Sequence, residues 1–212
     1  MSFNIQKYKE IQDFLNIQKS TAKIIAVSKT RSFDDVNEAY SAGIRNFGEI
    51  KVQEAIEKFD KFKSGKNLNL HMIGSLQSNK VKKALTIFNF FHSLDRESLA
   101  IEFSKFSDKL VDKFFFVQVN TGHEKQKSGI YPKHTNSFVQ HCLHDLNLNV
   151  IGLMCLPPIN QNPKDHFMML KDLTLKNKLK HLSIGMSGDY AEAIKCGSTY
   201  IRIGTGFFGL RK

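Results

Sequence analysis

Cysteine is scarce in this sequence, with only three in 212 residues. Cys142, Cys155 and Cys196 are far apart and form no Cys-x-x-Cys pair. Small secreted domains instead carry an even number of cysteines that pair as disulfides. The sequence therefore predicts a protein of a reducing compartment, and the cytoplasm is the expected location.

Long apolar runs are absent as well. No segment approaches the ~18 consecutive apolar residues that a membrane-spanning helix needs. Residues 1–19 (MSFNIQKYKEIQDFLNIQK) mix charged residues into an apolar pattern and lack the uninterrupted core of a signal peptide. We therefore expect neither secretion nor insertion into a membrane.

Acidic residues are fewer than basic ones. The sequence has 20 aspartates and glutamates and 31 lysines and arginines, which gives a formal net charge of +11. Such a surplus can attract the phosphates of a nucleic acid. However, only five of the basic residues are arginines, and the lysines are spread along the whole chain, whereas dedicated binders concentrate arginine and aromatic residues on one element. The densest cluster, residues 58–66 (KFDKFKSGK), is typical of the solvated end of a helix that runs into a turn. We expect a solvated lysine-rich surface, with nucleic-acid binding as an alternative.

Helix-like and strand-like segments alternate along the chain. Ile5, Tyr8, Ile11 and Leu15 recur at helical spacing, which predicts a first amphipathic helix within residues 3–18. Short apolar runs predict eight buried strands, at residues 23–29, 43–48, 70–74, 87–94, 113–120, 149–155, 180–185 and 199–204. Helical periodicity lies between them, at residues 33–42, 49–62, 78–85, 96–110, 132–144, 164–178 and 189–195.

This order of elements predicts the fold class. A strand followed by a helix, repeated, implies right-handed crossovers and a parallel sheet. Eight such units fit an α/β fold, a small (β/α)8 TIM barrel. An open doubly wound sheet is the main competitor, but no Gly-x-Gly-x-x-Gly follows the first strand. No linker-like tract divides the chain, so we expect residues 1–212 to form one domain with an extra N-terminal helix.

A barrel carries its function where strands end and the following loops begin. Lys29 ends the most apolar strand and continues the alternation of Ile25 and Val27, so its side chain would project from the barrel wall to the rim. One interpretation is an ordinary surface lysine. The other is an amine that forms a Schiff base with a carbonyl compound, which requires a neutral amine with a lowered pKa.

The last two strand ends add an independent feature. Phosphate sites of TIM barrels form from the loops after strands seven and eight, together with a short extra helix. Residues 186–188 (Met-Ser-Gly) and 204–206 (Gly-Thr-Gly) offer backbone N–H groups and hydroxyls at these places. Ser187 alone would be interpreted as a helix N-cap, but the two loops together favour a phosphate. A Schiff-base lysine and a phosphate site describe a site for pyridoxal phosphate.

The sequence resembles the pyridoxal phosphate homeostasis protein family, whose fold is similar to the barrel domain of alanine racemase. The resemblance extends from end to end of the chain and rests on the combination of segments. The matching segments are AVSKT (26–30), RNFGEIKVQEA (45–55), HMIGSLQSNKVK (71–82), VQVNTGHEKQKSGI (117–130), GLMCLPP (152–158) and LSIGMSGDYAEAIKCGSTYIRIGTGFFG (182–209).

This resemblance implies a role for each residue of the site. Lys29 would hold pyridoxal 5'-phosphate as an internal aldimine, and Arg202 would face the pyridine nitrogen. Because a guanidinium stays protonated, that nitrogen would remain unprotonated and the ring would be a weak electron sink. A salt bridge within the barrel is the other interpretation of Arg202. The remaining implied contacts are Asn46, which would line the cofactor, the main chain of Met186, and the phosphate ligands Ser187, Gly204 and Thr205.

The resemblance also implies a function, namely to bind, protect and deliver pyridoxal phosphate inside the cell without a clear catalytic activity. Apo-enzymes that use this cofactor are the implied partners, and a monomer is the implied state, with a dimer as the alternative. An amino-acid racemase is the main alternative. Racemases of similar fold take a second acid/base from a partner subunit that carries an extra β domain, and we expect no such domain after the barrel.

The chain departs from the family pattern at two places. Ile50-Lys51 stands where Asn-Tyr usually follows Phe-Gly-Glu, and Ser75 stands where His is common. The departures leave open the role of the rim after strands two and three. The candidates there for rim or partner contacts are His71, Gln77, Asn79 and Lys80, with Ser78 as a helix cap.

Motifs of other chemistries are missing. His141 and His144 lie three residues apart on an expected surface helix and supply too few ligands for a metal. Neither Gly-x-Ser-x-Gly nor His-Glu-x-x-His occurs. We therefore expect no metal site and no serine hydrolase or metalloprotease chemistry.

Overall fold

The computed structural model describes residues 3–62 and 67–210. Its eight strands form a closed barrel in which every neighbouring pair is parallel, including β8 with β1. The strands are β1 Lys23–Val27, β2 Asn46–Glu49, β3 Asn69–Met72, β4 Phe90–Leu94, β5 Phe114–Val119, β6 Val150–Cys155, β7 His181–Met186 and β8 Tyr200–Ile203. The (β/α)8 barrel is confirmed, and the open doubly wound sheet is wrong.

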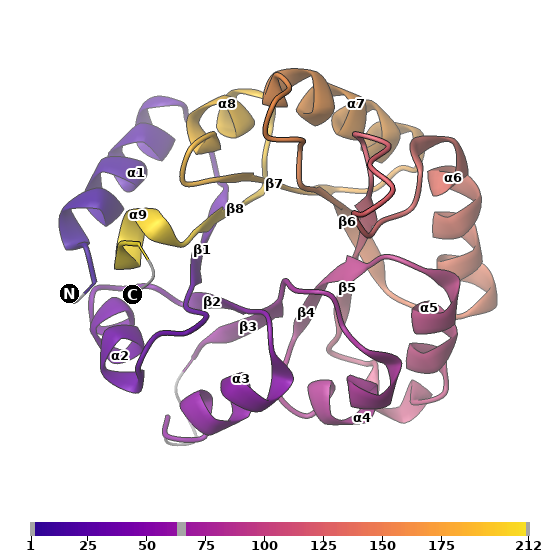
Figure 1. Cartoon of the computed structure of the whole chain (residues 1–212), viewed down its shortest axis with the longest axis horizontal. Coiled ribbons are helices and arrows are strands. Elements are labelled where there is room, and N and C mark those ends of the chain that lie inside the picture. Colours follow the sequence, from indigo (N-terminus) through magenta and orange to yellow (C-terminus); the bar gives the residue numbers. More distant parts are fainter. Residues whose placement is uncertain (1–2, 63–66, 211–212) are drawn as a thin grey trace.

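The helices form a ring outside this barrel (Figure 1). They are α1 Ile5–Ile17, α2 Phe33–Ser41, α3 Val52–Phe59, α4 Val81–Ala84, α5 Glu97–Ser104, α6 Pro132–Gln140, α7 Pro163–Lys176, α8 Tyr190–Lys195 and α9 Thr205–Phe208. Shorter 3₁₀ turns occupy Ser78–Lys80 and Ser107–Lys109, and a π turn occupies His141–Asp145. In the described part of the chain, no helix has both the length and the apolar character that crossing a bilayer requires.

Several expected boundaries shift for local reasons. The predicted strand at 43–48 begins only at Asn46, because Gly43 adopts φ +108° and donates its N–H to the Tyr40 carbonyl, which ends α2. The predicted helix at 78–85 divides into a 3₁₀ turn and α4, and the one at 132–144 ends in the π turn. Element ends are the part of a fold that periodicity predicts least well.

Side-chain caps start several of the helices. Ser32 Oγ accepts a hydrogen bond from the Asp35 N–H, and the Asp35 carboxylate accepts one from the Ser32 N–H, which forms a capping box at α2. The Asn4 side chain caps α1 by accepting a hydrogen bond from the Lys7 N–H, and Asn162 caps α7 with Pro163 at the first helical position. These caps satisfy N–H groups that have no partner within the helix.

The barrel interior combines an apolar cluster with polar side chains. Ile25, Phe90, Phe116, Met154 and Tyr200 come from five different strands and form one buried cluster. A larger apolar layer lies between the strands and the helices. Polar residues of the strands are also buried, among them His71, His92, Ser183 and Arg202. A TIM-barrel interior is a packed core rather than a pore.

The two ends of the described chain meet beside the barrel. The Asn4 N–H donates to the Phe207 carbonyl at 2.8 Å, and the Phe3 ring packs edge-on against the Phe207 ring at 5.2 Å. Figure 1 shows α9 next to α1 accordingly. The contacts hold α9 against the N-terminal segment. α9 is also the helix that follows β8, where a TIM barrel has its phosphate-binding helix.

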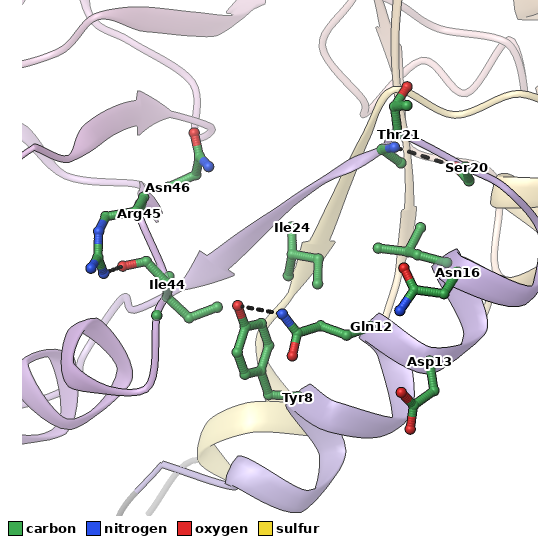
Figure 2. Close-up of a pocket in the computed structure, with 13 residues that line it drawn as sticks. Tyr8, Gln12, Asp13, Asn16, Ser20, Thr21, Ile24, Ile44, Arg45 and Asn46 are labelled. Atoms are coloured by element: carbon green, nitrogen blue, oxygen red, sulfur yellow. Dashed lines mark hydrogen bonds between the residues drawn. The ribbon is translucent and has the colours of Figure 1, made fainter.

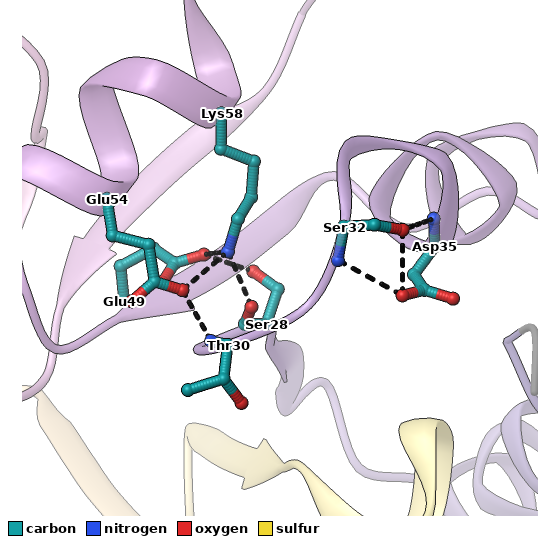
Figure 3. A network of polar contacts seen from close by, with 7 residues as sticks. All are labelled: Ser28, Thr30, Ser32, Asp35, Glu49, Glu54 and Lys58. Atoms are coloured by element: carbon teal, nitrogen blue, oxygen red, sulfur yellow. Dashed lines mark hydrogen bonds and ion pairs between the residues drawn. The ribbon is translucent and has the colours of Figure 1, made fainter. Parts of the chain in front are cut away.

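A buried ion-pair network joins β1, β2 and α3 (Figure 3). Lys58 Nζ lies 2.6 Å from Glu49 Oε1 and 3.1 Å from Glu54 Oε1, and it donates to the Ser28 carbonyl at 2.6 Å. We call Lys58, Glu49 and Glu54 the Lys58 network. Burial raises the pKa of the Glu49 carboxyl, while the charge and hydrogen bonds of Lys58 act in the opposite direction.

The expected solvated helix end at residues 58–66 is wrong for Lys58, whereas α3 does end at Phe59, and Asp60 and Lys61 are exposed. Lys58 exposes 6% of its surface and Glu49 exposes none. The lysine is buried because α3 turns this face towards the strand that ends on Glu49. Residues 63–66 of the same cluster lie outside the described residues.

Replacement of Lys58 tests this network. Lys58→Met should lower the free energy of unfolding by about 3–5 kcal/mol at neutral pH, because it leaves the Glu49 carboxylate buried without its counter-charge. The pKa of Glu49 is already raised by burial, and removal of the lysine should raise it further. A group with a raised folded-state pKa loses stability as the pH rises through that pKa. The loss should therefore be smaller at about pH 5 than at about pH 8 in urea unfolding curves.

Lys105→Met is the matched control. Its ammonium lies 2.7 Å from Glu102, but the lysine side chain is 61% exposed. Loss of such a surface pair should cost less than about 1 kcal/mol. Equally small losses for both variants would contradict a structural role for the buried pair.

Candidate functional site

A cavity of about 430 Å³ opens at the carboxyl ends of β1, β7 and β8. Its volume is within the range of small-molecule sites. Among the described residues that line it, three are cationic and none is a carboxylate. The lining residues are Val27, Lys29, Arg31, Ile50, Ile73, Leu156, Met186, Ser187, Gly188, Arg202, Gly204, Thr205 and Gly209.

β1 ends at Val27, two residues earlier than expected, so Lys29 lies in the turn after the strand. Both of its chain neighbours are held by the Lys58 network (Figure 3). Ser28 Oγ donates to Glu49 Oε1 at 2.7 Å, and the Thr30 N–H donates to Glu54 Oε1. Thr30 adopts φ +63°, which is uncommon for a β-branched residue. The surrounding contacts therefore fix the backbone on both sides of Lys29.

Ser187 connects the loops after β7 and β8. Its Oγ accepts a hydrogen bond from the Gly206 N–H at 3.2 Å. The alternative interpretation of Ser187 as the N-cap of α8 is wrong, because α8 begins after Asp189 and the Ser187 hydroxyl instead bonds to the first turn of α9. The carboxylate of Asp189 accepts a hydrogen bond from the Met186 N–H, which closes the first loop on itself.

These two loops present hydrogen-bond donors to the cavity. Ser187 and Thr205 carry hydroxyls, and no described residue accepts a hydrogen bond from the N–H of Gly188 or Thr205. A Cβ added at Gly188 would meet no atom within 4 Å, so the space over the first loop is open. Hydroxyls, N–H groups and nearby cations are the donors that bind phosphate. The residues present therefore fit a phosphate group.

Arg202 reaches the cavity from β8 and exposes 4% of its surface. Its Nη1 donates to the carbonyl and to Oγ of Ser183, both at 2.6 Å, and its Nη2 donates to the Cys155 carbonyl at 3.0 Å. No described carboxylate pairs with it, so the interpretation as a barrel salt bridge is wrong. Burial lowers the pKa of Arg202 to about 10, which still leaves the guanidinium protonated at neutral pH.

Asn46 lies away from this cavity, at the start of β2. Its Oδ1 accepts hydrogen bonds from Asn69 Nδ2 at 3.3 Å and from His71 Nε2 at 3.1 Å. It borders a separate cavity of about 440 Å³ between α1 and the starts of β1 and β2, where Gln12 donates to the Tyr8 hydroxyl (Figure 2). The main cavity thus brings together the predicted contacts other than Asn46, which are Lys29, Met186, Ser187, Arg202, Gly204 and Thr205.

The rim after β3 differs in part from expectation. His71 is fully buried inside the barrel and does not lie on the rim. Gln77, Asn79 and Lys80 are exposed on the loop that follows β3, where rim residues were expected. Ser78 does not cap α4, and its Oγ instead lies 3.5 Å from Arg96 Nη2.

The two departures from the family pattern meet in a third cavity, of about 540 Å³. Ile50, Lys51 and Ser75 all line it, together with Gln77 and Lys80. Ile50 also lines the main cavity. The departures therefore alter the neighbouring rim and leave Lys29 and the loops after β7 and β8 unchanged.

Three polar residues with structural roles near the site were not predicted from the sequence. Glu49 and Lys58 hold the end of β1, and the available signal was a glutamate at the end of an apolar strand. His92 is fully buried in the barrel, where it bonds to His71 and to Ser183, and a histidine inside an apolar run was its signal.

The two histidines considered as metal ligands have other partners. His141 Nδ1 lies 2.7 Å from the Asp145 carboxylate, and His144 Nε2 lies 3.1 Å from Gln140 Oε1. Across residues 3–62 and 67–210, no three histidine, cysteine or acidic side chains gather in a way that could hold a metal ion.

Comparisons with known sequences bear on this site. The family model of the alanine racemase N-terminal domain matches residues 5–212. The pyridoxal phosphate homeostasis protein of Aquifex aeolicus is 38% identical over 205 residues, which cover 92% of this chain and 89% of the relative. The protein of the same name from Synechocystis sp. is 37% identical over 202 residues, which cover 90% of this chain and 92% of the relative.

Solved structures agree with the fold. PipY of Synechococcus elongatus, solved without PLP, superposes with a TM-score of 0.86 at 31% identity over 97% of this chain and 99% of PipY. PipY solved with PLP bound gives a TM-score of 0.84 at 29% identity, again over 97% of this chain and 99% of PipY. Alanine racemase from Corynebacterium glutamicum shares the fold at 14% identity, with a TM-score of 0.71 over 99% of this chain and 62% of that one. Matched over nearly its whole length by these relatives, this chain belongs to the pyridoxal phosphate homeostasis protein family and has the barrel of the alanine racemase N-terminal domain.

Proposed function

We propose that this protein binds pyridoxal 5'-phosphate in the 430 Å³ cavity and serves its homeostasis in the cell by holding, protecting and delivering it. One observation carries the proposal: Lys29, Arg202 and the two donor-rich loops line the same cavity, and no described carboxylate does. PipY, a relative solved with PLP bound, supports the same assignment. On this proposal, residues 1–212 form one cofactor-binding domain that acts as a monomer in the cytoplasm.

The amine of Lys29 is the group that bonds covalently to the cofactor. Its nitrogen attacks the aldehyde carbon, a C=N bond replaces the C=O bond, and water leaves. This bond masks an aldehyde that would otherwise react with amines elsewhere in the cell. The Lys58 network supports the reaction by fixing Ser28 and Thr30, so that the strand end presents Lys29 to the cavity.

Arg202 sets the electronic state of the bound ring. Pyridoxal phosphate supplies an electron-accepting ring, which is strongest when its pyridine nitrogen is protonated. The guanidinium donates a hydrogen bond to that nitrogen and keeps its own proton. The nitrogen therefore stays unprotonated, and the ring is a poor acceptor for carbanion electrons.

The remaining lining residues favour a carrier over a racemase. Racemisation needs a second acid/base on the opposite face of the substrate. Among the described residues that line the cavity there is no tyrosine, histidine, cysteine or carboxylate. The partners on this proposal are apo-enzymes that receive the cofactor.

Removal of the hydroxyls tests the phosphate site. Ser187→Ala combined with Thr205→Val should raise the Kd for pyridoxal phosphate by about tenfold or more, because hydrogen bonds to a charged group contribute ~1.5–3 kcal/mol. The Kd for pyridoxal, which lacks the phosphate, should change by less than about threefold. Absorbance titration measures both constants, and an equal loss for both ligands would count against this location of the phosphate.

Deuterium exchange at the α-carbon of amino acids separates a carrier from an enzyme. The purified protein with its cofactor should exchange common amino acids no faster than free pyridoxal phosphate does, and it should still activate an apo-enzyme by transfer. A positioned base is worth ~10²–10⁴ in rate, so a true racemase would be readily detected. Rapid exchange that is lost in Lys29→Ala would overturn the carrier assignment.

A further inference from the structure

A continuous line of hydrogen bonds crosses the barrel interior from Arg202. Arg202 Nη1 lies 2.6 Å from Ser183 Oγ, and Ser183 Oγ lies 2.8 Å from His92 Nδ1. His92 Nε2 lies 2.9 Å from His71 Nδ1, and His71 Nε2 lies 3.1 Å from Asn46 Oδ1. We call these five residues the barrel chain. It connects the main cavity to the start of β2 through residues of β2, β3, β4, β7 and β8.

The donors and acceptors of the barrel chain fix its direction. A guanidinium only donates, so Ser183 Oγ accepts from Arg202. We assign the Ser183 hydroxyl hydrogen to His92 Nδ1, which is the other described partner of this oxygen. His92 must then carry its hydrogen on Nε2 and donate to His71 Nδ1. By the same reasoning, His71 carries its hydrogen on Nε2 and donates to Asn46.

The far end of the barrel chain agrees with this direction. Asn46 Oδ1 accepts a second hydrogen bond, from Asn69 Nδ2 at 3.3 Å. If the bonds ran from Asn46 towards Arg202, a donor would have to occupy the position of Asn46 Oδ1. His92 Nδ1 would then carry a hydrogen and could not accept the hydroxyl hydrogen of Ser183. With the side-chain amides of Asn46 and Asn69 oriented as in the structure, the bonds run from Arg202 towards Asn46 and every link has a donor and an acceptor.

Packing holds both imidazole rings in this arrangement and keeps them neutral. His71 stacks on Phe90 at 4.4 Å between ring centres, and His92 stacks on Phe116 at 4.3 Å. Burial, with the charge of Lys23 added, lowers the pKa of His71 to about 3. Burial, with His71 and Arg202 added, also lowers the pKa of His92 well below its usual value. Both imidazole rings therefore stay neutral at neutral pH. Neither ring carries a hydrogen on both nitrogens, which would change the direction of a hydrogen bond in the barrel chain.

We propose that His92 and His71 are positioning residues that orient Arg202 towards the pyridine nitrogen of the cofactor. By accepting the Ser183 hydrogen, His92 turns the lone pairs of Ser183 Oγ towards Arg202. Two Ser183 oxygens then hold Nη1, the Cys155 carbonyl holds Nη2, and the plane of the guanidinium is fixed. This inference rests on the proposed function, because it assigns the cavity to pyridoxal phosphate.

Nitrogen NMR of the apoprotein tests the barrel chain without any cofactor. With ¹⁵N-labelled histidine, both His71 and His92 should give the shift pattern of a neutral ring protonated at Nε2. Neither ring should titrate between about pH 5 and about pH 8, whereas an ordinary histidine does so. A hydrogen on Nδ1 of either ring, or titration of either ring in this range, would overturn the direction of the chain.

A cofactor analogue tests the effect on Arg202. In 1-deazapyridoxal phosphate a carbon replaces the pyridine nitrogen, so Arg202 has no acceptor on the ring. His92→Phe should raise the Kd for pyridoxal phosphate by about tenfold and the Kd for the analogue by less than about twofold, because only the former loses a charge-assisted hydrogen bond. Equal weakening of both ligands, or no change in either, would overturn the positioning role.

His181→Phe is the matched control. His181 packs against the same Phe116 and Tyr200 rings, at 6.4 and 5.7 Å, but it is not part of the barrel chain. Both Kd values should stay within about twofold of the original in this variant. If His92→Phe does not fold, Ser183→Ala breaks the same link with a smaller change and should give the same difference between ligands. Failure of wild-type protein to bind either ligand would refute the proposed function, while the NMR result would still report on the chain.

Discussion

The buried ammonium of Lys58 is the constraint on which the site depends. It lies between two carboxylates and a strand carbonyl, and these contacts join the ends of β1 and β2 to α3. Burial of a charge in a protein core is unfavourable unless it is paired and hydrogen-bonded. The backbone on both sides of Lys29 is therefore held in one geometry, because breaking these contacts would leave buried charges without partners. Lys29 itself lies in the turn after β1, and these contacts support that turn.

The same principle applies at the other wall of the cavity. Arg202 is a buried cation without a carboxylate partner among the described residues, and carbonyl and hydroxyl oxygens of Ser183 and Cys155 hold it instead. Neutral acceptors leave the positive charge uncompensated, so it remains available to a ligand. Lys29 and the hydrogen-bond donors of the two loops line the same cavity as this charge. The cavity therefore suits an anionic ligand that also carries a hydrogen-bond acceptor for Arg202. The described residues that line the cavity include no tyrosine, histidine, cysteine or carboxylate that could act as a second acid/base beside Lys29.

Much of this arrangement was predictable from local pattern, and the remainder depended on tertiary contacts. Alternating apolar runs and helical periods predicted the eight-unit barrel, and the barrel then implied that the strand ends of Lys29, Ser187 and Thr205 converge. Lys58 was misjudged because a lysine in a charged run is usually solvated, and only the packing of α3 on β2 shows that its side chain is buried. His71 was assigned to the rim although the predicted strand at 70–74 contains it, and its side chain is buried in the barrel interior. The hydrogen bond of Ser187 to the loop after β8 joins residues 19 positions apart, and no short-range signal could reveal it.

The most direct test of the central claim is reduction of the protein with borohydride in the presence of pyridoxal phosphate, followed by mapping of the labelled peptide. If Lys29 bonds to the cofactor, the yellow absorbance of the mixture should be lost on reduction. A single pyridoxyl adduct should map to Lys29 in both the wild-type protein and Lys80→Ala, whose exposed lysine lines only the neighbouring rim cavity. No specific adduct should form in Lys29→Ala. An adduct that maps to Lys80, or wild-type protein that carries no adduct, would contradict the assignment.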